Sequence, residues 1–202
     1  MGLAGRLTGD EKLTRLKWLR RLLKNVEEVE DKHLGTYNAF LFTLALGLEP
    51  KLIYEVGVSI GSSTNAFLMA LKRSGGRLVS CDVQDEWAGS VIDPDLLSRW
   101  TFVHAKSHDF AQTLTEKADL IYIDGAHNYS AVRQDVIDMW PLLKVGGYMV
   151  LHDTLYMPEG PGKVFRAMRD QCGEAVEMTF SFGFGIIHRL KDDPAQLKFP
   201  ER

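Results

Sequence analysis

The sequence predicts an α/β fold with a seven-stranded, mostly parallel sheet, its last strand antiparallel, helices on both faces and two extra N-terminal helices. From residue 51 onward, short and continuously apolar strands alternate with segments of helical periodicity, which is typical of a parallel sheet buried on both faces. The last two strands are separated only by a few residues around Phe182 and Gly183. Because a parallel crossover needs a longer connection, these two strands must be antiparallel neighbours. A chain of 202 residues suits one such domain.

Two helices are expected before the sheet. After Asp10, a good helix N-cap, apolar residues recur at helical spacing from Leu13 to Val29, and the helix runs to about Lys32. A second helix follows in the apolar stretch "TYNAFLFTLALGL". We expect residues 1–50 to form a helical extension that serves as a cap or a dimer element, with the apolar face between Leu13 and Val29 as the candidate dimer surface.

The remaining elements are predicted from period and flanking turn residues. Residues 51–190 form the main domain, and residues 191–202 form a polar tail. The expected strands are 52–58, 76–83, 101–105, 119–124, 147–153, 175–181 and 184–190, and the expected helical segments are 62–74, 93–100, 107–117, 129–144 and 161–172.

Composition and charge exclude several classes of protein. The formal net charge is −3, with 24 Lys and Arg against 27 Asp and Glu, so no overall basic field predicts a nucleic-acid partner. No apolar run approaches the ~20 residues of a membrane span, and the start lacks an apolar signal core. Cys81 and Cys172, without CxxC spacing, are expected to be reduced structural thiols. We expect a cytoplasmic protein.

A glycine-rich turn ends the first strand in "YEVGVSIGSST". Gly57 and Gly61 let the backbone bend tightly and approach a ligand, and the residues from Ser62 to Thr64 can cap the following helix. The spacing is neither GxGxxG nor a phosphate-binding GxxxxGK[ST] loop. The next strand ends on Asp82, whose carboxylate can accept both ribose hydroxyls of a nucleoside. The turn could also be purely structural, and Asp82 could simply cap a helix.

Carboxylates also end the fourth and fifth strands. "DLIYIDGAHNY" delivers Asp124 and His127, and "YMVLHDT" delivers His152 and Asp153. These ends face the ligand crevice of an open parallel sheet, and two unpaired carboxylates there would repel. A divalent cation such as Mg²⁺, Mn²⁺ or Ca²⁺ resolves that conflict. In the plainer alternative, Asp124 caps the next helix and His127 is a turn histidine.

These motifs together resemble class I S-adenosylmethionine-dependent methyltransferases, which have a Rossmann-like sheet. Glu-x-Gly-x-x-x-Gly-x-Ser/Thr, beginning at Glu55, is their first motif. The region "DLIYIDGAHNYSAVRQDVIDMWPLLKVGGYMVLHDT" resembles the small bacterial branch related to macrocin O-methyltransferases and cephalosporin hydroxylase-like proteins. The resemblance covers about residues 51 to 190. Metal-dependent relatives often carry Asp or Asn where this sequence has Thr154, and no third carboxylate is evident.

The resemblance implies roles for particular residues. S-adenosylmethionine would be the cofactor, with Mg²⁺ as a second, metal cofactor. His127 would be the catalytic base beside Asp124, and the loop with Ser107 and His108 would touch the adenine. The implied metal ligands are Asp124 and Asp153, and the implied cofactor-binding residues are Glu55, Gly57, Ser59, Gly61, Ser63, Asp82, Ser107 and Asp124.

The expected reaction is methyl transfer to a hydroxyl of a small molecule, such as a sugar, a natural product or a phenol. Methyl transfer requires a deprotonated oxygen held in line with the sulfonium methyl group. The loop "LYMPEGPGK", with Tyr156, is a candidate lid and acceptor wall, and Trp87 could stack on adenine or substrate. The sequence leaves two alternatives: another, hydroxylase-like activity on the same scaffold, and a non-catalytic nucleoside-binding protein. The partners expected are therefore a small-molecule substrate and a second copy of the chain.

Overall fold

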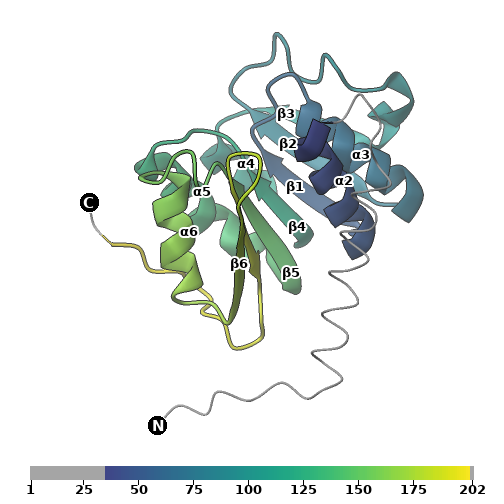
Figure 1. The fold of residues 1–202 in the computed structure, drawn as a ribbon. Coiled ribbons are helices and arrows are strands. Elements are labelled where there is room, and N and C mark those ends of the chain that lie inside the picture. Colours follow the sequence, from purple (N-terminus) through teal and green to yellow (C-terminus); the bar gives the residue numbers. More distant parts are fainter. Residues whose placement is uncertain (1–34, 201–202) are drawn as a thin grey trace.

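The computed structural model describes residues 35–200 and confirms the predicted α/β architecture (Figure 1). Helix α2 precedes a sheet whose strands alternate with helices until two final strands follow directly on each other. The elements are α2 (Gly35–Leu48), β1 (Leu52–Val56), α3 (Ser62–Ser74), β2 (Arg77–Asp82), the 3-10 helix η1 (Pro94–Arg99), β3 (Trp100–His104), α4 (Ser107–Thr113), β4 (Ala118–Ile123), α5 (Tyr129–Met139), the 3-10 helix η2 (Trp140–Leu142), β5 (Leu143–His152), α6 (Pro161–Arg169), β6 (Glu174–Met178) and β7 (Phe184–His188).

The seven strands form one sheet in the order β3-β2-β1-β4-β5-β7-β6. The pairs from β3 through β5 are all parallel, whereas β7 is antiparallel to both of its neighbours, β5 and β6. The single reversed strand is the predicted one. The chain moves outward from β1 to β3 and then returns to place β4 on the other side of β1. This reversal opens a crevice at the carboxyl ends of β1 and β4, where ligands bind in sheets of this kind.

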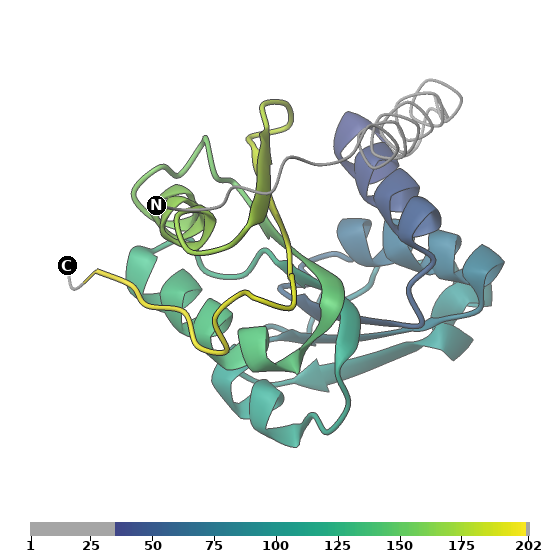
Figure 2. The ribbon, with the colours of Figure 1, turned by 90° about the horizontal axis from the view of Figure 1, so that it is seen from below.

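Helices cover both faces of the sheet (Figure 2). On one face, Phe40 of α2 and Phe67 of α3 share an apolar cluster with Ile53 of β1. On the other face, α4, α5 and α6 pack against the opposite side chains of the strands, such as Tyr54. Every residue of β1 is buried, so its apolar run is continuous rather than alternating. Burial on both faces therefore explains the strand pattern from which the fold was predicted.

Helix α2 is an integral layer of this domain. It matches the second helix predicted before the sheet, and it is buried continuously from Ala39 to Ala45. Its partner is α3, against which it packs on the sheet face of the first cluster. The other predicted helix, ending near Lys32, and the candidate dimer surface between Leu13 and Val29 lie outside the described residues.

Several element boundaries differ from those predicted. The expected helix over 129–144 ends at Met139, because Pro141 has no N–H group to continue the hydrogen-bond ladder, and β5 already begins at Leu143. The segment expected as a helix over 93–100 is a 3-10 helix with Pro94 at its start, and α4 ends at Thr113 rather than at residue 117.

The segment after residue 190 folds back onto the domain. Leu197 is buried in the second apolar cluster, and the carbonyl of Pro200 accepts a hydrogen bond of 2.8 Å from the Tyr129 hydroxyl. The backbone N–H of Lys198 donates a hydrogen bond of 2.8 Å to Oε1 of Gln171. The polar composition of this segment does not predict these contacts, because the segment contains few apolar residues and several of the contacts are made by backbone groups.

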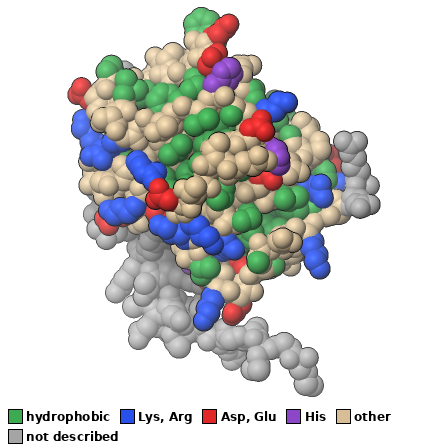
Figure 3. Space-filling view, turned by 180° about the vertical axis from the view of Figure 1, so that it is seen from behind, with side chains coloured by type: hydrophobic (Ala, Val, Ile, Leu, Met, Phe, Trp, Pro, Cys, Tyr) green, Lys and Arg blue, Asp and Glu red, His purple; other side chains and the backbone are tan. Residues whose placement is uncertain are grey.

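The distribution of charged side chains on the surface agrees with the small net charge of −3. On the face shown in Figure 3, acidic and basic side chains are interspersed among apolar ones. In the part of the chain from 35 to 200, no helix combines the length and apolar character needed to cross a bilayer.

The approach of β1 to β4 makes Gly57 sensitive to substitution. A Cβ atom at Gly57 would lie 2.2 Å from the backbone oxygen of Asp124, and the residue has φ +93°. Gly146→Ala is the matched control, since Gly146 has φ +86° and open space around it. We expect Gly146→Ala to lower the free energy of unfolding by about 1 kcal/mol and Gly57→Ala by about 3 kcal/mol or more, measured by denaturant unfolding. Equal losses in the two variants would contradict the close contact.

Candidate active site

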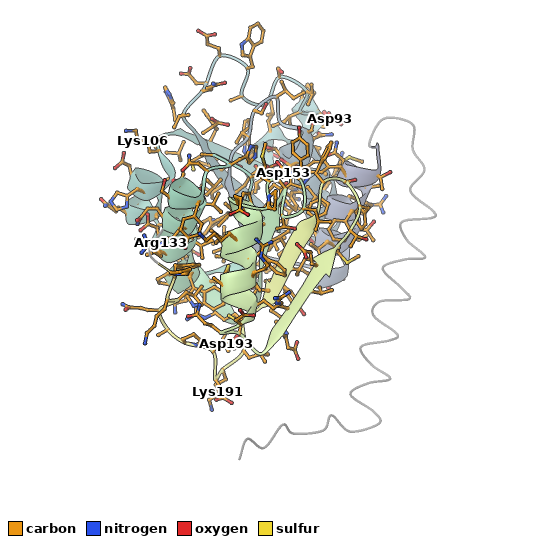
Figure 4. The ribbon with its side chains drawn as sticks, turned by 60° about the vertical axis from the view of Figure 1, so that its left-hand side comes forward. Asp93, Lys106, Arg133, Asp153, Lys191 and Asp193 are labelled. Carbon is orange, nitrogen blue, oxygen red and sulfur yellow. The ribbon has the colours of Figure 1, made fainter. Side chains whose placement is uncertain are left out.

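A cleft of about 1010 Å³ lies at the carboxyl ends of β1, β2, β4 and β5. Figure 4 shows Asp153 at this end of the molecule together with Lys106 and Asp93, whereas Lys191 and Asp193 lie at the opposite end. The volume is at the upper limit of the range of roughly 300–1,000 Å³ usual for small-molecule sites. Eight of the predicted site residues line it: Gly57, Ser59, Ser63, Asp82, Ser107, Asp124, His127 and Asp153.

Asp82 organises the glycine-rich turn. Its Oδ2 accepts hydrogen bonds from the backbone N–H groups of Val58 (2.8 Å) and Ser59 (2.9 Å), and its Oδ1 accepts one from Gln84 (3.0 Å). Burial works against the charged form, but these backbone N–H groups hold the pKa of Asp82 below its ordinary value. Ser59 has φ +49°. The low pKa keeps the carboxylate ionised at neutral pH, and Asp82 lines the cleft.

Glu55 lies behind the turn and does not line the cleft. It is fully buried, and it accepts hydrogen bonds from Ser63 (2.7 Å), Thr64 (2.8 Å) and Ser80 (2.6 Å). Burial raises its pKa to about 7, although the three hydroxyls oppose the rise. Glu55 thus fastens the first turn of α3 to β1 and β2. Gly61, the other predicted cofactor residue outside the lining, is the N-cap of α3, with φ +97°.

A buried acid that sequence reasoning missed lies beyond the third strand. Ser107, at the start of α4, donates a hydrogen bond to Asp135 of α5, which is 4% exposed and lines the cleft. Burial raises the pKa of Asp135 to about 6, against the opposing effect of the Ser107 hydroxyl. Asp135 falls on a predicted helix rather than at a strand end, so no motif marked it. The predicted adenine-loop residue His108 lines the same end of the cleft, whereas Trp87 is exposed and does not line it.

Asp124 has both carboxylate oxygens occupied by hydrogen-bond partners. Oδ2 accepts from the hydroxyls of Tyr37 (3.0 Å) and Tyr122 (2.9 Å), and these two hydroxyls also contact each other. Oδ1 faces Nε2 of His127 at 3.5 Å and Nδ1 of His152 at 3.3 Å. Burial alone would raise the pKa of Asp124, but the bonds to His127, His152 and Tyr122 lower it well below the ordinary range.

Asp124 is not a helix cap. The side chain of Asn128 caps α5 by accepting a hydrogen bond of 3.0 Å from the backbone N–H of Ala131. Asp124 lies before this cap, and its carboxylate contacts the side chains of Tyr37, Tyr122, His127 and His152. This geometry removes the plainer alternative for Asp124.

Asp153 completes a cluster that we call the carboxylate–histidine cluster: Asp124, His127, His152 and Asp153. Nε2 of His127 lies 3.0 Å from Asp153 Oδ2, and Nδ1 of His152 lies 3.4 Å from its Oδ1. Asp153 has φ +59°, an unusual conformation for a residue with a Cβ atom. Its pKa is raised by burial and by the charge of Asp124, with the histidines opposing the rise. The expected repulsion between the two acids is thus met by two imidazole rings.

His152 has a role that sequence reasoning did not assign. Its Nε2 lies 2.9 Å from the backbone carbonyl of Ser181, an acceptor, while its Nδ1 faces the two carboxylates. Both ring nitrogens therefore need a hydrogen, which describes an imidazolium. Burial opposes this charge, but Asp124 and Asp153 raise the pKa of His152 above its ordinary value.

The cluster fits a divalent cation in part. Asp124, His152 and Asp153 each offer a ligand atom, and these atoms lie within 4.8 Å of one another. The two carboxylate oxygens suit Mg²⁺, whereas an imidazole nitrogen suits Mn²⁺, Fe²⁺ or Zn²⁺ better. Thr154, at the position where metal-dependent relatives carry Asp or Asn, does not line the cleft, and its hydroxyl lies toward Gly183. Mg²⁺ would therefore be held by the two acids and by water.

Comparison with known proteins gives the family. Residues 54–154, which include the glycine turn, Asp82, Asp124 and Asp153, match the family described as "Methyltransferase domain". The chain belongs to this methyltransferase family. The predicted methyltransferase family is therefore confirmed.

Individual proteins similar to this chain are also methyltransferases. The O-methyltransferase hkm8 of Aspergillus hancockii is 28% identical over 124 residues, which are 59% of this chain and 49% of that protein. The chain thus spans only about half the length of that curated relative. The SAH-bound methyltransferase PaMTH1 of Podospora anserina has a TM-score of 0.61 at 15% identity, covering 95% of this chain and 100% of its own.

A third comparison is with an O-methyltransferase that carries the cofactor itself. TomG of Streptomyces achromogenes, involved in tomaymycin synthesis and solved in complex with SAM, has a TM-score of 0.63 at 15% identity, covering 93% and 92% of the two chains. At such identities the two structural neighbours establish the shared fold.

The buried carboxyl of Glu55 makes the stability of the fold depend on pH in a specific way. Because its folded pKa of about 7 exceeds the ordinary 4.5, Glu55 stabilises the fold below about pH 4.5 and loses this contribution as pH rises through 7. Glu55→Gln cannot ionise. We expect the free energy of unfolding of the variant to improve relative to wild type between about pH 4.5 and 7. A difference between the two proteins that stays constant with pH, measured by urea unfolding, would contradict a buried, proton-binding Glu55.

Proposed function

We propose that the protein transfers a methyl group from S-adenosylmethionine to a hydroxyl of a small molecule. The observation that carries this proposal is the continuity of the cleft, which joins the glycine turn and Asp82 to the carboxylate–histidine cluster. A nucleoside site alone would not need the cluster, and a metal or acid–base site alone would not need the turn. Family membership over residues 54–154 supports the same reading.

In this proposal the cofactor lies along the ends of β1, β2 and β4. Asp82 accepts the ribose hydroxyls, and the backbone from Gly57 to Ser59 approaches the methionine part. Ser107 and the buried Asp135 stand at the far end, where the adenine would lie. Ser63, whose hydroxyl is donated to Glu55, orders the start of α3 beside the cofactor.

His127 is the proposed general base. It lies in the cleft with its side chain 39% exposed, and its ring is oriented by Asp124 and Asp153. The hydrogen bond to Asp124 raises the pKa of His127 above its ordinary value, with burial opposing and Asp153 adding to the rise. A higher pKa makes the neutral ring a stronger base toward the acceptor hydroxyl. Positioning by two acids also keeps the ring in reach of that proton.

A divalent cation at Asp124 and Asp153 is the less direct part of the proposal. When bound, such a cation would lower the pKa of the acceptor hydroxyl and orient its oxygen. The two acids would hold it, and the Tyr37 and Tyr122 hydroxyls would keep Asp124 Oδ2 turned away, so that Oδ1 alone faces the site. Mg²⁺ suits the acids, and His152 would have to release its Nδ1 proton before it could add a nitrogen ligand.

The donor atoms of the carboxylate–histidine cluster are also relevant to the alternative of a hydroxylase-like activity. A hydroxylase-like activity would use the mixed oxygen and nitrogen donors of Asp124, His152 and Asp153 for a redox metal. The methyltransferase family match favours methyl transfer instead. Residues 51–190 remain our proposed catalytic domain, to which α2 adds one layer and the side chain of Tyr37. A homodimer and a cytoplasmic location stay predictions.

Asp82 tests the cofactor site. Asp82→Asn removes the charge and one acceptor oxygen while keeping the shape, so we expect the affinity for S-adenosylhomocysteine to fall at least tenfold, measured by calorimetry. Asp85→Asn is the matched control, because Asp85 is exposed and pairs with His104 outside the cleft. An unchanged affinity in Asp82→Asn would refute the ribose assignment.

His127 tests the chemistry separately from cofactor binding. We expect His127→Gln to lower kcat by roughly 10²–10⁴-fold with little change in S-adenosylhomocysteine affinity. In the wild type, kcat/KM should rise with pH through the raised pKa of His127, because only the neutral ring accepts a proton. In the His127→Gln variant this increase of kcat/KM with pH should be absent. The control is His104→Gln, on an exposed ring that does not line the cleft.

The same assay tests the cation. If a cation at Asp124 and Asp153 assists, chelation should lower kcat and Mg²⁺ or Mn²⁺ should restore it. Full activity after chelation would leave His127 and the two acids as the catalytic apparatus and exclude the cation from the proposal.

A further inference from the structure

Two large aromatic side chains stand exposed at the mouth of the cleft. Tyr156, in the loop after β5, is 62% exposed, and Phe182, in the β6–β7 connection, is 60% exposed. Their ring centroids are 5.0 Å apart with an interplanar angle of 56°, and both residues line the same cleft as the carboxylate–histidine cluster. Adjacent exposed aromatics on a concave surface are typical of ligand contact rather than of core packing.

The backbone that presents Phe182 is strained. Ser181 has φ +48°, Phe182 has φ +70° and Gly183 has φ +97°, so three consecutive residues adopt the left-handed region. Only the glycine adopts it without a steric penalty, and a bulky aromatic residue rarely does. Strain of this kind persists where surrounding contacts enforce it, and it clusters at ligand sites.

Hydrogen bonds fix the strained turn to the loop after β5. The carbonyl of Phe182 accepts from the backbone N–H groups of both Leu155 and Tyr156, each at 3.0 Å. The carbonyl of Ser181 accepts from His152, over 2.9 Å, and the ring centroids of His152 and Phe182 are 6.4 Å apart. The aromatic pair is therefore held at a fixed position beside the carboxylate–histidine cluster.

Most polar groups next to the pair are already engaged. Both oxygens of Asp124 and both nitrogens of His152 have partners within the protein. Tyr37, whose ring centroid lies 4.8 Å from that of His152, also lines the cleft, and its hydroxyl bonds to Asp124. A sugar would bring several hydroxyls to a wall with few groups to pair with them, and each unpaired hydroxyl would weaken binding. An aromatic ring needs one polar contact and a flat apolar surface.

We infer that Tyr156 and Phe182 form an aromatic clamp that binds the ring of a phenolic acceptor and directs its hydroxyl toward His127 and Asp153. The inference rests on the proposed methyltransferase function and deepens it, since it selects phenols from the hydroxyl-bearing acceptors. The ring stacks on or lies edge-on to the two side chains, and the phenolic oxygen is the methyl acceptor.

Binding of simple probes to the full chain tests the clamp. Calorimetry would compare catechol with trans-1,2-cyclohexanediol and methyl glucoside, on protein saturated with S-adenosylhomocysteine. We expect catechol to bind at least tenfold more tightly than either saturated probe. Phe182→Leu and Tyr156→Leu should each weaken catechol binding about tenfold and leave S-adenosylhomocysteine affinity unchanged. Trp87→Leu is the matched control, because Trp87 is an equally exposed aromatic outside the cleft.

Phe182→Gly separates the clamp from a merely structural role. Glycine relieves the positive φ, so the variant should unfold at the same or a higher denaturant concentration than wild type while losing catechol affinity. Equal binding of catechol and the cyclic diol, or unchanged catechol binding in Phe182→Leu, would overturn the clamp. Failure of S-adenosylhomocysteine to bind would overturn the proposed function instead, and the probe comparison without it would still decide the clamp.

Discussion

The close approach of β1 and β4 at their carboxyl ends is the constraint on which the site depends. The backbone N–H of Asp124 donates to the carbonyl of Val56 over 2.8 Å, and Gly57 leaves no room for a side chain against the Asp124 backbone. This contact sets the glycine turn directly beside the residue that begins the carboxylate–histidine cluster. The proposed cofactor site and the proposed catalytic residues are therefore two parts of one cleft, and the separation between them is fixed by main-chain atoms rather than by flexible side chains.

The electrostatics of the cleft follow from the saturation of Asp124. Two phenol hydroxyls occupy one oxygen and two imidazoles face the other, so the carboxylate stays ionised although it is buried. The negative charge in turn orients His127 and favours the charged form of His152. Either a bound cation or a protonated His152 would compensate the negative charge of the two carboxylates, Asp124 and Asp153. Behind the turn, Glu55 does not line the cleft itself, but the hydroxyls of Ser63 and Thr64 that it binds order the start of α3.

The positions of the acids at the ends of the strands were predictable, because the end of a buried strand can be recognised in the sequence. A continuous apolar run that stops on an acid places that acid at the ligand edge, which located Asp82, Asp124 and Asp153. Contacts that join distant segments had no such signal: Tyr37 reaches Asp124 from α2, and Asp135 meets Ser107 between two helices. Glu55 fitted the cofactor motif in sequence, yet its side chain points away from the cleft because three hydroxyls surround it. Pro141 ends α5 early, although the apolar periodicity of the sequence continues through Leu142 and Leu143.

A crystal structure of the full chain with S-adenosylhomocysteine tests the central claim most directly, that one cleft joins a nucleoside site to the carboxylate–histidine cluster. The account predicts both ribose hydroxyls within hydrogen-bond distance of Asp82 and the thioether sulfur turned toward Asp124, His127 and Asp153, with Tyr156 and Phe182 facing the remaining space. A cofactor bound with its ribose away from Asp82, or with its sulfur facing away from the cluster, would contradict it.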